Sequence, residues 1–483
     1  MTGADPYLPG HGDDRFGVEH YALTLRYRPA GNHLDGRAEI HLTATTELRE
    51  VVLDLHGLEV TSLRTTGARV ARWTHRASRI RVRFAAPVPA GSAVVVTIAY
   101  RGSPHAMPGP DGPAGWEELT DGVLVAAQPH GAPTWFPCND RMADKATYRV
   151  SVTTDAAYRV VSNGTLVSRR TVGRRVEWVH EQRQPMAPYL ATLQIGRYTA
   201  EHVPAETPCW LVAPPTRMPA ARAAFADQPR MLALFSGLYG PYPFDQYTVV
   251  VTDDPLEIPL ESQSLSTFGT NHLTRDWSAQ RLIAHELSHQ WFGNAVTAAS
   301  LSDIWLHEGF ACYSEWLWSE ASGRSTVEEE AALHHLQLAR ERQDLVLTDP
   351  GPKRAFDDRV YKRGALALHT LRRCVGDEAF FAFLRSWVTT HRFGVVTTAG
   401  FEHAVRAAAG PGPVAALRPW LHEEALPAWP PAPTGPLVPA PAAAPTSAPS
   451  AGGAPSAGGR PPAGGSSSAS TWSAPAVRGR RRG

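Results

Sequence analysis

The chain has 483 residues, of which 43% are hydrophobic and 19% are charged, a composition typical of a globular protein. This length allows two or three domains with a large buried core. The formal net charge of +1 argues against an overall attraction to nucleic acid or to anionic membranes. The N-terminus lacks the basic and apolar regions of a secretory signal, and no apolar run is long enough to span a membrane. We therefore expect a cytoplasmic protein.

The region from residue 18 to 200 alternates between apolar and polar residues. This alternation is clear over 21–27, 38–44 and 80–84, where apolar side chains occupy every second position. Such runs, separated by turns rich in Gly, Pro and Asn, are typical of antiparallel β-sheet with one buried face. We predict an all-β domain over 18–200, preceded by a flexible N-terminus over 1–17.

Helical spacing replaces the alternation after about residue 200. Apolar residues recur at helical spacing in the segments 216–238, 277–293, 325–345, 363–375 and 377–390. The segment Tyr247–Thr252 still has the pattern of a strand. We predict a second domain over 201–429 that mixes α and β and is mainly helical after residue 270.

The last segment, 430–483, consists almost entirely of Pro, Ala, Gly and Ser and ends in several arginines. It contains too few apolar residues to offset the entropy lost on ordering, so we predict a disordered tail. The terminal arginines could contact RNA, anionic lipid or acidic proteins, but a solubilising tail without a partner is the simpler interpretation.

One short motif, His285-Glu286-Leu-Ser-His289, has the spacing of a metal site. Positions four apart lie on one face of a helix, so His285 and His289 can present two imidazoles to one metal ion. Glu286 is placed to reach a water molecule rather than the metal. A structural zinc site has four protein ligands, whereas a catalytic site leaves one position open. The motif therefore predicts a catalytic metal centre that needs a third protein ligand.

A second helical segment, 301–313, offers this third ligand. Glu308 follows His289 after eighteen intervening residues, and its carboxylate could reach the metal from the opposite side. His307 is the competing ligand, but it faces about 100° away from Glu308 on a helix, so we expect it to line the site or to pack behind it. We predict that His285, His289 and Glu308 bind one Zn²⁺ ion per chain. Without Glu308, two ordinary polar histidines on an amphipathic helix would be a serious alternative.

The sequence around these residues resembles the zinc aminopeptidases of the aminopeptidase N and leukotriene hydrolase type. The resemblance extends roughly from residue 20 to 425 and includes HELSHQWFGN at 285–294, LHEGFACY at 306–313, QPHGAPTWFPCND at 128–140, DKATY at 144–148, VVSNG at 160–164, PMAPYL at 185–190, YPF at 242–244 and VYKRGA at 360–365. It implies a saddle-like antiparallel sheet in the N-terminal domain and a thermolysin-like catalytic domain. It also implies a short member, because too little sequence follows Tyr361 for the C-terminal helical domain that many members carry.

The resemblance also implies two catalytic roles. Glu286 would act as general base and later return the proton to the leaving amine. Tyr361 would donate a hydrogen bond to the developing oxyanion. The alternative for Tyr361 is a half-buried tyrosine that only contributes to packing.

Three further residues are implied to contact the substrate. Glu261 and Gln128 would receive its α-ammonium group, and a buried carboxylate paired in this way disfavours a blocked N-terminus. Leu260 stands where the family has methionine and preserves its apolar bulk. Ile258 replaces a glycine and Ser262 an asparagine, so we expect the first subsite to differ from that of the family. A position of Glu261 on a surface loop is the alternative.

The sequence thus predicts a zinc metallo-aminopeptidase that hydrolyses the first peptide bond of peptides with a free N-terminus, a role in peptide catabolism. An additional epoxide hydrolase activity is disfavoured by the missing helical domain, and an endopeptidase is disfavoured by Glu261. A catalytically inactive scaffold is disfavoured because the ligands, the base and the tyrosine are all present. We expect peptides as partners and no nucleic acid on the folded domains.

Overall fold

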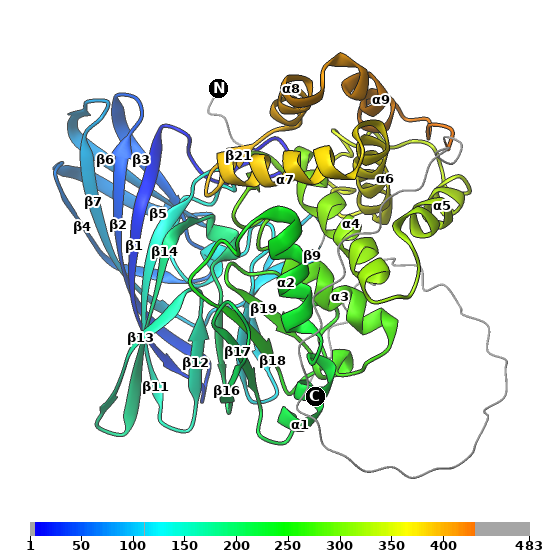
Figure 1. Ribbon diagram of the computed structural model, residues 1–483. Coiled ribbons are helices and arrows are strands. Elements are labelled where there is room, and N and C mark those ends of the chain that lie inside the picture. The colour runs from blue at the N-terminus through cyan, green and yellow to red at the C-terminus, as the bar shows by residue number, and fades with distance from the viewer. Residues whose placement is uncertain (1–4, 111, 430–483) are drawn as a thin grey trace, which may run out of the picture.

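The computed structural model describes residues 5–110 and 112–429. Strands gather on one side of the molecule and helices on the other, and the chain passes from the first region to the second near residue 200 (Figure 1). The prediction of an N-terminal β domain followed by a mainly helical catalytic domain is confirmed. The tail predicted over 430–483 lies outside the described residues, and the domain limits stay predictions.

A seven-stranded sheet forms the framework of the N-terminal domain, in the order β13-β14-β11-β1-β2-β7-β4. Strand β1 pairs antiparallel with β2 and parallel with β11. Tyr21, Leu23 and Leu25 are buried as the alternation predicts, because successive side chains of a strand point to opposite faces. The strands are β1 (Phe16–Arg28), β2 (His33–Ala44), β4 (Glu59–Thr66), β7 (Ala93–Gly102), β11 (Ala146–Asp155), β13 (Thr165–Val172) and β14 (Arg175–Met186).

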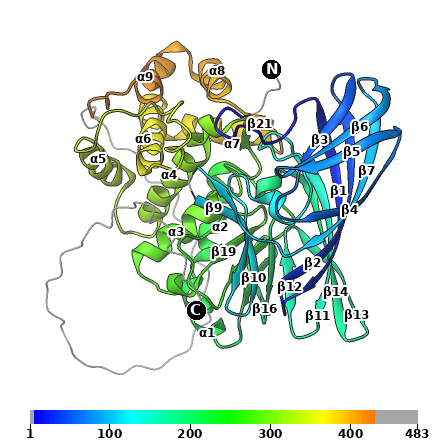
Figure 2. The same cartoon turned by 180° about the vertical axis from the view of Figure 1, so that it is seen from behind.

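Two smaller sheets complete this domain. A three-stranded sheet has the order β3-β6-β5, with β3 (Leu48–Asp54), β5 (Val70–Arg76) and β6 (Arg79–Val88). A five-stranded sheet has the order β12-β15-β10-β9-β8, with β8 (Met107–Gly109), β9 (Gly112–Leu119), β10 (Gly122–Ala126), β12 (Arg159–Ser162) and β15 (Leu193–Gly196). Seen from behind, β9 and β10 lie toward the helices of the second domain, so this sheet borders the catalytic region (Figure 2).

The catalytic domain begins with a four-stranded sheet in the order β16-β17-β18-β19. Strands β17, β18 and β19 run parallel to one another, and β16 is antiparallel to β17. Every residue of β18 is buried, which agrees with its three consecutive valines. The strands are β16 (Thr199–Val203), β17 (Cys209–Ala213), β18 (Tyr247–Val251) and β19 (Leu265–Phe268).

Nine α-helices of the described chain follow or interrupt this sheet: α1 (Met218–Ala224), α2 (Gln228–Tyr239), α3 (Trp277–Ser288), α4 (Trp305–Ala321), α5 (Val327–Leu338), α6 (Asp358–Val375), α7 (Asp377–His391), α8 (Thr398–Ala409) and α9 (Pro411–His422). Strands β20 (Thr297–Ala298) and β21 (Val395–Val396) pair with each other in a two-stranded parallel sheet. Helices α4 and α6 cross closely at Gly309 and Gly364, where a Cβ on Gly309 would lie 2.8 Å from the Cα of Gly364. Among the described residues, no helix combines the length and the apolar character needed to cross a membrane.

The segment before β1 differs from the flexible N-terminus expected over 1–17. Within residues 5–17, Tyr7 and Leu8 are buried. The Asp5 carboxylate accepts a hydrogen bond from the Leu301 amide at 2.6 Å. The Tyr7 hydroxyl donates to Asp349 and accepts from the Gly351 amide. These contacts, all with the catalytic domain, hold the segment in place.

Candidate metal centre and substrate site

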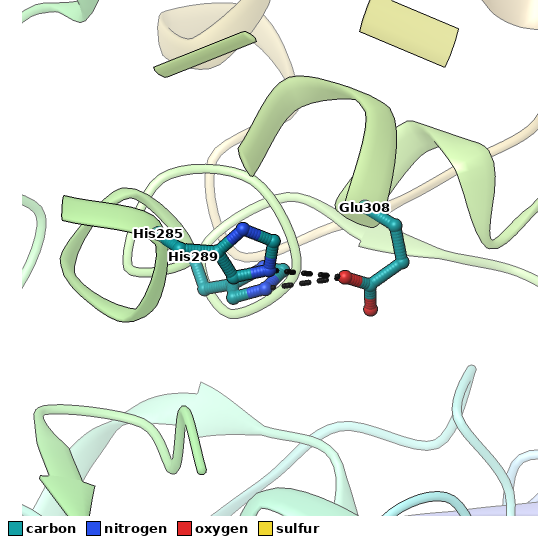
Figure 3. Close-up of side chains that lie close together, drawn as sticks. All are labelled: His285, His289 and Glu308. Atoms are coloured by element: carbon teal, nitrogen blue, oxygen red, sulfur yellow. Dashed lines mark ion pairs between the residues drawn. The ribbon is translucent and has the colours of Figure 1, made fainter. Parts of the chain in front are cut away.

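Two consecutive helices bring together the three predicted metal ligands. Helix α3 begins after Asp276, whose carboxylate accepts from the Ala279 amide at 3.1 Å, and it carries His285 and His289 near its C-terminal end. Glu308 lies in the first turn of α4. The nearest oxygen of Glu308 is 3.4 Å from Nε2 of His285 and 3.5 Å from Nε2 of His289 (Figure 3). The three ligand atoms lie within 4.8 Å of one another, so the group could hold a metal ion.

Hydrogen bonds on the far side of both imidazoles fix their orientation. The Nδ1 atom of His285 lies 2.7 Å from Glu315, whose carboxylate also contacts Arg281 at 3.3 Å. The Nδ1 atom of His289 lies 3.0 Å from the carbonyl oxygen of Phe292. Because a carbonyl only accepts, this contact places the proton on Nδ1 and leaves the Nε2 lone pair free for a metal. Glu315, which the sequence analysis missed, follows Glu308 by two helical turns, and this spacing could have revealed it.

The two histidines and Glu308 stabilise one another's charged forms within this buried group. Burial alone would lower the pKa of His285, but its hydrogen bonds with Glu308 and Glu315 raise that pKa to about 10. The pKa of His289 is raised to about 9, chiefly by the charge of Glu308 acting against burial. Burial acts against ionisation of Glu308, yet the two histidines hold its pKa well below the usual range. Without a metal, these raised pKa values mean that the two imidazoles carry protons, and a bound metal would displace them. Two imidazoles and one carboxylate form a donor set that fits Zn²⁺ with an open position.

Glu286 lies beside the ligands without joining them. Its side chain is 5% exposed, and its Oε2 atom has no hydrogen-bond partner among the described residues. Burial raises the pKa of Glu286 to about 8, and the charge of Glu261 adds to this effect. A buried, unsatisfied carboxylate next to a metal-binding group is unusual in a purely structural role, and it suits a group that exchanges a proton.

Tyr361 lies in the first turn of α6 and faces the same group. The helix begins after Asp357, whose carboxylate accepts from the Arg359 amide at 3.0 Å. The Tyr361 ring stacks on the His285 ring with 5.9 Å between their centroids and 22° between their planes. Burial, together with the charges of Glu308 and Glu261, raises the pKa of Tyr361 well above its usual value. Its hydroxyl therefore stays protonated and can donate a hydrogen bond.

The predicted amine contacts meet across the domain boundary. The Nε2 atom of Gln128 donates to the Oε1 atom of Glu261 at 2.5 Å, although the two residues are 133 positions apart. Glu261 is buried, not on the surface, and burial raises its pKa. Leu260, half-buried, exchanges two backbone hydrogen bonds with Thr267 in β19, at 3.0 and 2.9 Å. These bonds attach the segment that carries Glu261 to the central sheet.

His307, Ile258 and Ser262 do not belong to the metal-binding group or to the amine contacts. His307 is fully buried behind the site, where its Nε2 atom accepts from the Ala298 amide at 2.7 Å. Burial lowers the pKa of His307 to about 3, so it stays neutral. Ile258 is 50% exposed, whereas Ser262 is buried.

A β domain joined to a mainly helical domain, with His-Glu-x-x-His on one helix and a glutamate on the next, is the architecture of a two-domain zinc metallopeptidase. Residues 18–190 match the Peptidase M1 N-terminal domain, and residues 224–420 match the Peptidase family M1 domain. The chain belongs to the M1 family of peptidases. Members of this family are zinc enzymes, so zinc is the cofactor that the family implies.

Solved structures and curated relatives agree with this assignment. The M1 zinc metallopeptidase of Deinococcus radiodurans is 30% identical, with a TM-score of 0.81, and the match covers 89% of this chain and 99% of that chain. A mutant of that enzyme, 29% identical at the same TM-score and coverage, has been solved with a Tyr-Ser-Ala substrate. Aminopeptidase B of Rattus norvegicus is 28% identical over 290 residues, which is 55% of this chain and 43% of the rat protein. The chain thus spans less than half of the length of that relative.

Proposed function

We propose that this chain is a zinc aminopeptidase, in which His285, His289 and Glu308 bind the metal. The observation that carries the proposal is the buried carboxylate of Glu261, which accepts a hydrogen bond from the half-buried Gln128 and lies near the metal-binding group. The charges of His289 and Glu308 act on the pKa of Glu261, so this carboxylate lies within electrostatic reach of the centre. A buried anion next to the metal group would bind the α-ammonium of a peptide and align its first peptide bond.

The chain's own residues would then divide the reaction among them. When bound, zinc supplies a Lewis acid that polarises the scissile carbonyl and makes water a better nucleophile. Glu286 takes a proton from the attacking water and delivers it to the leaving amine. Tyr361 donates a hydrogen bond to the carbonyl oxygen as this atom gains negative charge. Glu261 and Gln128 hold the α-ammonium, and Leu260 contributes an apolar wall to the first subsite.

The relatives support this assignment. The rat relative is an aminopeptidase by name, and the Deinococcus radiodurans mutant was solved with a short peptide whose first residue is tyrosine. Peptides with a free N-terminus are therefore the substrates that we propose, and the cytoplasm is the proposed location. Nothing among the described residues favours an added epoxide hydrolase activity.

The test is hydrolysis of a panel of fluorogenic aminoacyl amides, each compared with its N-acetylated form, before and after chelation of the metal. We expect cleavage of the free-amine substrates only, with loss on chelation and recovery on addition of Zn²⁺. Glu286→Gln should reduce kcat by about 10² to 10⁴, because it removes the proton acceptor. Glu341→Gln, at an exposed position outside the site, is the matched control and should behave as wild type.

Other outcomes would redirect the assignment. Cleavage of acetylated substrates would show that Glu261 does not select for the amine, and would indicate endopeptidase action. A protein that binds zinc but cleaves neither set would indicate an inactive scaffold.

A further inference from the structure

We infer that Lys145, a residue of the N-terminal domain, is a positioning residue for the amine anchor Glu261. Its ammonium group holds the loop after helix α3, and this loop holds the backbone of Glu261. The inference rests on the proposed function, because it concerns how the amine contact of that function is kept in place.

Lys145 donates only to neutral oxygen atoms. Its Nζ atom lies 2.9 Å from the carbonyl oxygen of Asn294, 3.1 Å from that of Ala295 and 2.9 Å from the hydroxyl of Thr297. A longer contact of 3.4 Å reaches the carbonyl oxygen of Gly394. Among the described residues, no carboxylate forms an ion pair with Lys145. A cation that is withdrawn from water without a counter-ion is costly, and burial lowers the pKa of Lys145 to about 7. The four oxygen ligands offset part of the lost hydration of the ammonium group.

The base of this side chain is fixed in the N-terminal domain. Lys145 directly precedes β11, and the neighbouring Asp144 carboxylate accepts from the Val18 amide at 3.0 Å and from the Asn139 side chain at 2.6 Å. The ammonium group therefore extends from a rigid part of the β domain. It reaches a loop whose first residues follow the metal-binding helix in the catalytic domain.

Asn294 links Lys145 to the amine anchor Glu261 through its own hydrogen bonds. Its side-chain Nδ2 atom donates to the carbonyl oxygen of Glu261 at 2.9 Å, while its own amide donates to the carbonyl oxygen of His289 at 3.0 Å. One residue thus touches the end of helix α3, the amine anchor and Lys145. The loop is tightened further by Thr297, whose hydroxyl donates to the carbonyl oxygen of Gly293 at 2.7 Å.

Other bonds hold the same segment independently of Lys145. The side chain of Gln290 donates to the carbonyl oxygen of Ser262 at 3.2 Å and accepts from the Ser264 amide at 2.7 Å. Asn163 donates to the carbonyl oxygen of Gln263 at 2.8 Å. Loss of the ammonium group should therefore shift Asn294 and the Glu261 backbone without releasing the whole segment. The metal ligands should stay in place, because their orientation depends on Glu315 and Phe292.

A pair of inhibitors can measure this effect apart from turnover. An amino-acid hydroxamate and its des-amino analogue both bind zinc, and only the first carries an amine for Glu261. The ratio of their inhibition constants reports the amine contact. In Lys145→Met, which keeps the aliphatic stem but removes the charge, we expect this ratio to fall about tenfold, as for the loss of one hydrogen bond to a charged group. Zinc content and the affinity for the des-amino compound should stay unchanged.

Matched variants complete the test. Lys145→Arg, which keeps a cationic donor, should restore part of the ratio, and Lys353→Met, at an exposed lysine outside the site, should leave it unchanged. Thr297→Val removes one oxygen ligand of Lys145 and should lower the ratio by a smaller factor, which provides a test if Lys145→Met does not fold.

The results distinguish this inference from the proposed function. An unchanged ratio in Lys145→Met or Thr297→Val, or an equal loss of affinity for both inhibitors, would overturn the positioning role. If the wild-type protein itself showed no preference for the amine-bearing inhibitor, the proposed amine anchor would fail instead.

Discussion

The two halves of the candidate site are built in different ways. The metal half comes from two consecutive helices, with eighteen residues between His289 and Glu308. The amine half is assembled from distant segments, since Gln128 and Glu261 are 133 positions apart and Lys145 reaches Asn294 across 149 positions. The first half depends on helix geometry and the second on how the two domains pack. Changes at the domain boundary should therefore affect recognition of the amine before they affect the metal.

The largest effect that separates the halves should come from Tyr361→Phe. This change removes a single hydroxyl on the metal side, where it would stabilise charge that appears only in the transition state. We expect kcat to fall by about 10² to 10³ with little change in KM, and the inhibitor ratio described above to stay the same. Steady-state kinetics together with zinc analysis would measure this.

A matched control is Tyr158→Phe, whose hydroxyl contacts Asp121 in the β domain. This variant should retain the wild-type kcat. Loss of an oxyanion donor should lower kcat by about 10² to 10³. If kcat falls by less than about fivefold in Tyr361→Phe, this tyrosine does not stabilise the oxyanion.

An intermediate effect is expected from Glu315→Gln. The imidazole of His285 would lose its charged acceptor, and Arg281 would lose its partner in the same step. Loss of such an outer partner typically weakens metal binding by about 10- to 100-fold. Competition with a chelator would measure this change, and the discrimination between free and acetylated amines should persist in the zinc-saturated protein. An unchanged zinc affinity would show that Phe292 and the helix alone orient the ligands.

The smallest effect concerns the segment before β1. His11 lies 2.7 Å from Asp140. Burial acts to lower the pKa of His11, but the hydrogen bond and charge of Asp140 raise it above the usual value, with Asp54 adding to the rise and Arg79 opposing it. Because the folded state binds the proton more tightly, this stabilisation is complete below about pH 6.5 and is lost as the pH rises through the raised pKa.

The measurement is the difference in Tm between wild type and His11→Gln from pH 5.5 to 8.5. We expect this difference to be largest at the acidic end, at a few degrees or less, and to shrink toward pH 8. Zinc affinity should not change. A difference that grows with pH would contradict the assigned charge of His11.

Sequence reasoning recovered the parts of the molecule that depend on local periodicity. The alternation over 21–27 and the valine-rich segment of β18 both correspond to strands, and the spacing of His285 and His289 placed both imidazoles on one face. Helices α8 and α9 were missed, because Gly410, Pro411, Gly412 and Pro413 at their junction resemble a loop. In the structure, Gly410 has a positive φ of 80°, which separates the two helices.

Long-range contacts could not be predicted in the same way. Nothing near Lys145 indicates that its ligands lie in the loop after α3, and nothing near Tyr7 indicates its partners at Asp349 and Gly351. Such contacts depend on tertiary packing, which a single sequence does not specify locally. The roles of Glu286, Tyr361, Glu261 and Gln128 came from resemblance to a family and stay predictions until they are measured.

The bonds from Asp5 and Tyr7 have a consequence for motion. These residues reach partners 296 and 342 positions further along the chain, so the β domain is attached to the catalytic domain at both of its ends. Two attachments restrict the relative motion of the domains more than the chain connection near residue 200 would alone. We therefore expect Gln128 and Glu261, which come from the two domains, to keep their hydrogen bond when a peptide binds.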